Sequence, residues 1–194
     1  MSDIINGILE QLGGGTSEKI GSTLGVDPGI IQKAIPIVLP LILGGLKQQS
    51  INNGGQERVD HILNKYGNPE VLNDIDGHVN QMAGKDNFDE NLGGLIGNSG
   101  SQITDILSKN FNLDSGTAAK IIPVIAPLIL GYLTKSRDNN PEGSQGFASF
   151  LDQNGDGSIV DDVVGFFSNK APDNQQGSGG GIMDILGGLL GGKN

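Results

Sequence analysis

The most constraining feature of this sequence is an internal repeat in which two aliphatic segments carry two prolines at the same spacing. The first reads Ile35-Pro36 and then Pro40-Leu41-Ile42-Leu43-Gly44, and the second reads Ile122-Pro123 and then Pro127-Leu128-Ile129-Leu130-Gly131. They lie 87 residues apart, and about half of the aligned positions around them are identical. Because chance composition does not give such a match, we interpret the chain as a duplication of one unit.

Both aliphatic segments predict long buried helices. Asp27 and Asp114 stand where an N-cap is expected, and Pro28 fits the first helical position. The helices are predicted to run from Pro28 to about Gln48 and from Ser115 to Ser136. Their apolar side chains occupy every face, which predicts central helices. The internal prolines should bend each helix, as a curved core helix or, alternatively, as a hinge or channel-like kink.

Shorter elements complete each unit. We expect helices near 3–12 and 16–24 in the first copy and near 90–96 and 102–110 in the second, with polar loops at 48–55 and 137–144. Asn68 should cap a helix that begins at Pro69. The predicted fold is all-α, with two tandem copies of a multi-helix unit around central Pro-kinked apolar helices. The first repeat would span 1–82 and the second 88–170, leaving 171–194 as a flexible Gly-rich linker and a short apolar tail helix.

The end of the sequence resembles the start of each unit. Asp184-Ile185-Leu186-Gly187-Gly188-Leu189-Leu190 aligns with residues 3–9 and with residues 90–96. Apolar side chains in this pattern need a surface to cover, so the tail should fold back or dock on another copy, giving a homo-oligomer or a filament. A sticky or disordered tail is the simpler alternative.

The charge and the apolar lengths limit the partners. A net charge of −10 argues against nucleic acid and anionic membranes and favours cations or basic proteins. The uninterrupted apolar runs 34–46 and 121–133 have about 13 residues, against roughly 20 for a membrane span, so they predict buried helices. The chain has no cysteine. Its first residues lack a signal-peptide pattern, so we expect a cytoplasmic protein, with leaderless export as the alternative.

One motif predicts an ion site. Asp152, Asn154 and Asp156 alternate in a loop closed by Gly157, which is how Ca²⁺ loops bring hard oxygens to one point. Ser158 could add its carbonyl. The twelfth position holds Val163 instead of Glu, so Asp161 or Asp162 would have to close the site. A helix-capping turn is the structural alternative, and the corresponding loop of the first copy lacks the two carboxylates.

No pattern of catalytic residues is recognisable. His61 and His78 have no ligand spacing around them and are expected on the surface or on a helix face. Phosphate-binding loops, zinc-binding helices and nucleophile motifs are missing. We therefore predict a noncatalytic interaction or assembly protein that binds calcium and has an unidentified protein partner. A membrane-surface or pore-forming helical protein and an unrecognised hydrolase are the alternatives.

The proline-containing segments together with the Asp-rich loop resemble the YidB-like family of bacterial domains of unknown function. The resemblance covers roughly Asp3 to Asn169 and leaves the Gly-rich tail outside. It implies a small all-α fold in a bacterial protein and implies no activity.

Overall fold

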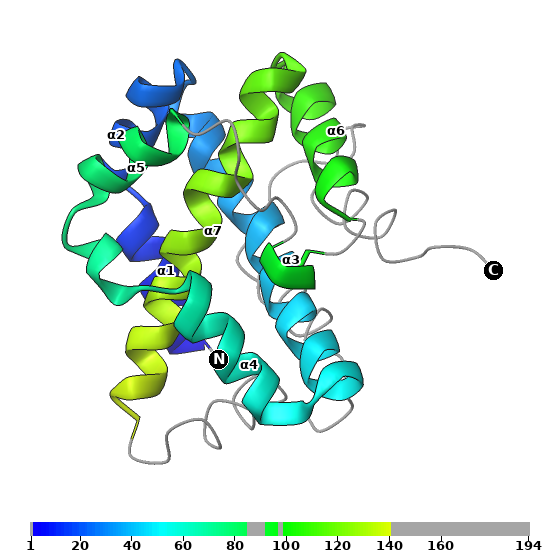
Figure 1. Ribbon diagram of the computed structural model, residues 1–194. Coiled ribbons are helices and arrows are strands. Elements are labelled where there is room, and N and C mark those ends of the chain that lie inside the picture. Colours follow the sequence, from blue (N-terminus) through cyan, green and yellow to red (C-terminus); the bar gives the residue numbers. More distant parts are fainter. Residues whose placement is uncertain (1, 85–91, 97–98, 141–194) are drawn as a thin grey trace.

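The computed structural model describes residues 2–84, 92–96 and 99–140, which form helices and turns without a strand in these ranges (Figure 1). The predicted all-α class is confirmed. The division of the chain into units 1–82, 88–170 and 171–194 remains a prediction. The elements are α1 (Ser2–Leu12), α2 (Gly15–Leu24), α3 (Pro28–Asn53), α4 (Gly55–Tyr66), the 3₁₀ turn η1 (Pro69–Leu72), α5 (Ile75–Ala83), the 3₁₀ turn η2 (Leu92–Gly94), α6 (Ser99–Phe111) and α7 (Ser115–Asp138).

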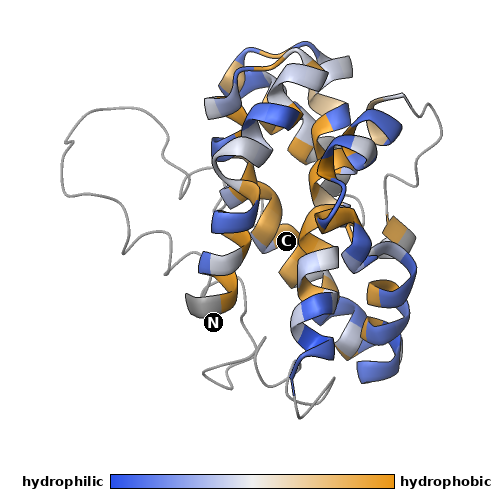
Figure 2. Cartoon of the chain, turned by 90° about the vertical axis from the view of Figure 1, so that its left-hand side faces the viewer, coloured by the Kyte–Doolittle hydropathy of each residue, from blue (hydrophilic) through white to orange (hydrophobic). Residues whose placement is uncertain are grey.

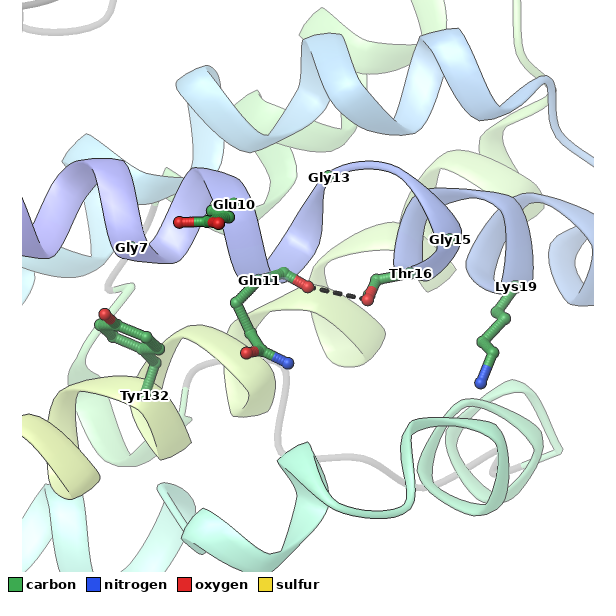
Figure 3. Close-up of a pocket in the computed structure, with 8 residues that line it drawn as sticks. All are labelled: Gly7, Glu10, Gln11, Gly13, Gly15, Thr16, Lys19 and Tyr132. Atoms are coloured by element: carbon green, nitrogen blue, oxygen red, sulfur yellow. Dashed lines mark hydrogen bonds between the residues drawn. The ribbon is translucent and has the colours of Figure 1, made fainter.

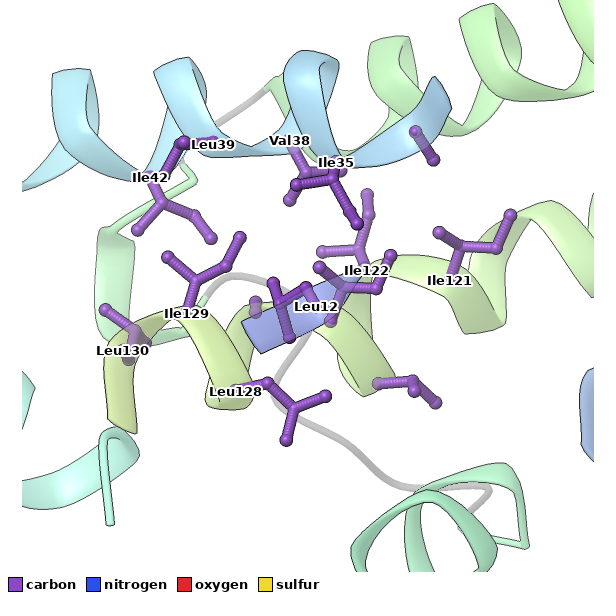
Figure 4. Packing of buried hydrophobic residues seen from close by; sticks show 14 of the residues in the cluster. Leu12, Ile35, Val38, Leu39, Ile42, Ile121, Ile122, Leu128, Ile129 and Leu130 are labelled. Atoms are coloured by element: carbon purple, nitrogen blue, oxygen red, sulfur yellow. The ribbon is translucent and has the colours of Figure 1, made fainter. Parts of the chain in front are cut away.

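The two proline-containing helices form the centre of the molecule. Helix α7, yellow-green in Figure 1, contacts every other α-helix, and all of its residues from 121 to 131 are buried. Across from it, Ile35, Val38 and Ile42 of α3 face Ile122 and Ile129 (Figure 4). Apolar residues gather between the helices and hydrophilic ones lie outside (Figure 2). The central position predicted from all-round apolarity is therefore confirmed.

Both long helices begin at the predicted N-caps. The Asp27 carboxylate accepts a hydrogen bond from the amide of Gly29 at 2.7 Å, and the Asp114 carboxylate accepts one from the amide of Thr117 at 2.9 Å. These bonds satisfy amides that have no partner inside the helix. Bonds from the side chain and the backbone of Thr117 also lower the pKa of Asp114 below its ordinary value.

The turn before each long helix repeats with the sequence spacing of 87 residues. Gly25 and Asn112 hold corresponding left-handed conformations, with φ of 68° and 52°. The amides of Val26 and Leu113 each bond to the carbonyl five residues earlier, at 2.8 and 3.0 Å. Asn is one of the few residues with a side chain that tolerates this conformation, which explains how it replaces Gly. The two junctions thus share the same geometry of helix, turn and helix.

The loop predicted for 48–55 is wrong. Helix α3 continues to Asn53, and only Gly54, with φ of 122°, separates it from α4. The polar residues that suggested a loop form the solvated last turns of a helix. Gln49 in this stretch is buried and hydrogen-bonded. Polarity alone does not end a helix, whereas a glycine with positive φ does.

The short helix predicted near 90–96 is also wrong within the described residues. Residues 92–94 form only a 3₁₀ turn, and Gly94 has a φ of 93° that an α-helix does not allow. A pair of glycines weakens a helix because glycine gives up the most backbone freedom on folding. The apolar residues of this segment are nevertheless buried, as its pattern suggested.

Helices α3 and α7 are long and apolar enough to cross a membrane by length and composition. In their most apolar stretches, 56% and 72% of the residues are buried inside the protein. The core helix of a water-soluble protein passes the same test. The packing around α7 is what such a core helix requires.

Candidate functional site

The predicted calcium ligands Asp152, Asn154, Asp156, Ser158, Asp161 and Asp162 lie outside the described residues. Within the ranges that the structure describes, no group of three or more His, Asp or Glu side chains is placed to hold a metal ion. The candidate sites in the described ranges are two places where a short apolar segment packs on a long helix.

The first such place, the α7 contact site, is where α1 packs on α7. Ile5, Ile8 and Leu12 of α1 are buried to within 1% of complete burial. Gly7 lies directly against the Tyr132 ring, and a Cβ atom at this position would overlap the Tyr132 hydroxyl (Figure 3). The close approach depends on the missing side chain of Gly7.

The second place, the α3 contact site, is where residues 92–96 lie on α3. Leu92, Leu95 and Ile96 are buried. Gly45 of α3 touches the backbone carbonyl of Leu95 so closely that a Cβ atom would overlap it. The amide of the Gln49 side chain also donates a hydrogen bond to the Gly94 carbonyl at 2.9 Å.

A third residue completes the polar contact at the α3 contact site. Nε of Arg58 on α4 donates a hydrogen bond to the side-chain oxygen of Gln49 at 2.9 Å. Both ends of the buried Gln49 amide are thus satisfied, which a buried polar group requires. The glutamine is fixed in the orientation that binds the 92–96 backbone.

The two contact sites are related by the 87-residue repeat. Ile8 corresponds to Leu95, and Tyr132 corresponds to Gly45. Helix α1 packs on the later long helix, α7, whereas residues 92–96 pack on the earlier one, α3, at positions that correspond in the alignment. The alignment of residues 3–9 with 90–96 anticipated that both segments are apolar contacts, but it did not predict this crossed arrangement.

An open pocket of about 510 Å³ lies beside the α7 contact site (Figure 3). Its lining includes Glu10, Thr16 and Lys19. The Thr16 hydroxyl donates to the Gln11 carbonyl at 2.7 Å, and Lys19 forms an ion pair with Asp76 at 2.7 Å. Charges of opposite sign on exposed side chains do not favour an ionic ligand, so this pocket supports no specific chemistry.

A buried arginine joins the end of α7 to α4. The Arg137 guanidinium donates to Asp60 at 3.0 Å, to Asn64 at 2.8 Å and to the neighbouring Asp138 at 2.9 Å. Its side chain is 10% exposed. Arg137 belongs to α7 and not to the polar loop that the sequence predicts at 137–144, so this role was not expected. The signal available in sequence was weak, because both α4 partners are more than 70 residues away.

The two histidines have different environments. His61 is exposed, whereas His78 lies on a face of α5 that is buried in the protein. Nε2 of His78 lies 3.1 Å from the carbonyl oxygen of Val124 and must carry the hydrogen, because a carbonyl only accepts. Val124 lies in the helical turn before Pro127, where the proline disturbs the backbone bonds. His78 supplies an external donor there.

The comparisons with known proteins identify a family. Residues 6–136 and 134–194 match the family described as "Bacterial protein of unknown function (DUF937)". No curated protein and no solved structure matches the chain. The second match includes the Gly-rich tail, so the expectation that the tail lies outside the family was wrong. The chain belongs to this DUF937 family, the YidB-like bacterial domains of unknown function.

Proposed function

We propose that this protein is a noncatalytic bacterial interaction or assembly protein that self-associates through its C-terminal tail and is stabilised by calcium. One observation carries the proposal. Two short aliphatic segments of the same pattern are each buried on a long core helix, and the pattern occurs a third time in the tail. Packing such a segment on an apolar surface lowers the free energy, whether the surface belongs to the same chain or to another.

The polar residues of the described core support a structural role. Gln49 holds the 92–96 segment, Arg137 joins two helices, and His78 donates to a helix carbonyl. Each of these buried groups is used in holding helices together. A nucleophile, a base and an oxyanion donor around one position would instead support catalysis.

Deleting residues 178–194 is expected to lower the oligomer size, because it removes the third copy of the pattern. Sedimentation velocity across a range of concentrations should show larger species for the full chain than for the shortened one. A full chain and a shortened chain that sediment identically at every concentration would refute self-association through the tail.

Calcium is expected to raise the thermal stability of the full chain. The four carboxylates of the Asp152–Asp162 loop should repel one another without an ion. An ion that binds only to the folded state stabilises that state by about 2.7 kcal/mol at a hundredfold excess over Kd. Because the closing Glu is missing, we expect a Kd on the order of 10⁻⁵ to 10⁻³ M. Thermal melts with calcium and with chelator should differ, and Asp156→Ala should remove the difference.

The matched control for the calcium effect is Asp74→Asn, since the Asp74 carboxylate caps α5 through the amide of Gly77 at 2.9 Å and lies in the first copy. Its melts should keep the calcium dependence of the wild type. Coinciding wild-type melts at millimolar calcium would mean that the Asp152 loop is only a capping turn.

A further inference from the structure

The α3 contact site selects for a specific five-residue sequence. Leu92, Leu95 and Ile96 supply its buried aliphatic side chains. Gly94 has a φ of 93°, a conformation that residues with a side chain rarely adopt. The site therefore accepts Leu-Gly-Gly-Leu followed by another aliphatic residue.

The tail carries the same five-residue pattern. Leu186-Gly187-Gly188-Leu189-Leu190 differs from residues 92–96 only in its last residue, where Leu replaces Ile. Gly188 corresponds to the positive-φ Gly94. Residues 43–46 also read Leu-Gly-Gly-Leu, but they are followed by Lys47 and lie inside α3, where they form part of the contact site itself.

The tail fits the α7 contact site less well. There α1 buries three aliphatic residues, and the third is Leu12. In the alignment of the tail with α1, the residue corresponding to Leu12 is Lys193. A lysine ammonium at a position with 1% exposure would lose its hydration without a partner, which is costly. Of the two contact sites, α3 is the better match for the tail.

We propose that residues 186–190 of one copy take the place of residues 92–96 on α3 of a second copy. The inference rests on the proposed self-association through the tail and names its receiving site. The exchange preserves three aliphatic contacts, the positive-φ glycine and the carbonyl that accepts the Gln49 hydrogen bond. Exchange of an equivalent element is a low-cost route to association, and a head-to-tail contact that does not close into a ring continues as a filament.

The chain has no cysteine, so an introduced cysteine is the only thiol that a crosslinker can modify. Asn53→Cys places a thiol on the exposed end of α3, one turn beyond Gln49 on the same face. Gly191→Cys places one next to the matching tail segment. The two full-length single-cysteine variants are mixed and treated with a short bis-maleimide, so that any 53–191 crosslink joins two molecules. Thr23→Cys, exposed on α2, replaces Asn53→Cys in the control mixture.

We expect the 53–191 crosslink to exceed the 23–191 crosslink severalfold. Adding Gly188→Ala to the tail should weaken association about five- to thirtyfold, because a Cβ atom disfavours positive φ. Gly192→Ala, outside the matching segment, should leave it unchanged.

Two results would overturn the exchange while leaving the self-association proposal intact. In one, deleting residues 178–194 lowers the oligomer size but the 53–191 and 23–191 yields are equal. In the other, Gly188→Ala and Gly192→Ala weaken association equally. If the deletion leaves the oligomer size unchanged, self-association through the tail fails, and the exchange fails with it.

Discussion

Replacing Arg137 by alanine is expected to lower the free energy of unfolding by about 3 kcal/mol, the low end of the effect of breaking a buried ion pair. The substitution removes three hydrogen bonds and the packing of the aliphatic stem. The carboxylates left behind are partly hydrated, with side-chain exposures of 27% for Asp60 and 54% for Asp138. Because water can hydrogen-bond to these carboxylates in the variant, we expect a loss at the low end of the range for a buried ion pair.

The matched control is Lys135→Ala, which removes an equal charge from the same last turn of α7 but from an exposed position. It should change the free energy of unfolding by less than about 0.5 kcal/mol. Urea unfolding followed by circular dichroism measures both variants. Arg137→Lys should remain destabilised, because an ammonium cannot reproduce the planar fork. If Arg137→Ala and Lys135→Ala lower the free energy of unfolding equally, net charge and not the buried network determines the effect.

The local features of the fold were predictable from the sequence. Asp27 and Asp114 cap their helices through short-range bonds, and Asn68 caps η1 through the amide of Glu70 at 2.9 Å. Each interaction spans at most three residues, so the identity of a few neighbours decides it. The all-round apolarity of α3 and α7 likewise predicted their central position.

The features that were missed depend on distant parts of the chain. The last turns of α3 are held by Gln49 contacts to Arg58 and to Gly94, and the second of these lies 45 residues away. Burial of His78 depends on Val124, 46 residues away. The sequence does not reveal these partners, so it does not predict that Gln49 and His78 are buried. Tertiary contacts override such local preferences.

The candidate site was predictable in composition but not in arrangement. Alignment of residues 3–9 with 90–96 identified both apolar segments, yet only the structure shows that they lie on opposite long helices. Gly45 and Gly7 make the close approaches possible. Glycine pairs are frequent in this chain, so no sequence pattern distinguishes these positions from the others.

Replacing Ile129 by alanine is expected to cost about 2–5 kcal/mol of the free energy of unfolding in water, through lost burial and a remaining cavity. Ile129 is 0% exposed and faces Ile42 of α3 (Figure 4). Ile51→Ala makes the same chemical change at a position with 68% exposure, and should change the free energy by less than about 0.5 kcal/mol. Urea unfolding of the two variants beside the wild type measures both effects.

The same pair of variants decides between a core helix and a membrane helix for α7. If α7 is the core of a water-soluble fold, Ile129→Ala is strongly destabilised in water. The wild type then does not co-sediment with liposomes, and liposomes do not change the unfolding of either variant. In a bilayer, lipid tails are as apolar as isoleucine, so truncating an aliphatic side chain loses little hydrophobic free energy. The opposite outcome has two parts: the wild type co-sediments with liposomes at any pH, and Ile129→Ala and Ile51→Ala are equally stable. That outcome would favour the pore-forming alternative over a core helix. Because Ile129 is fully buried in the core, we expect the first outcome.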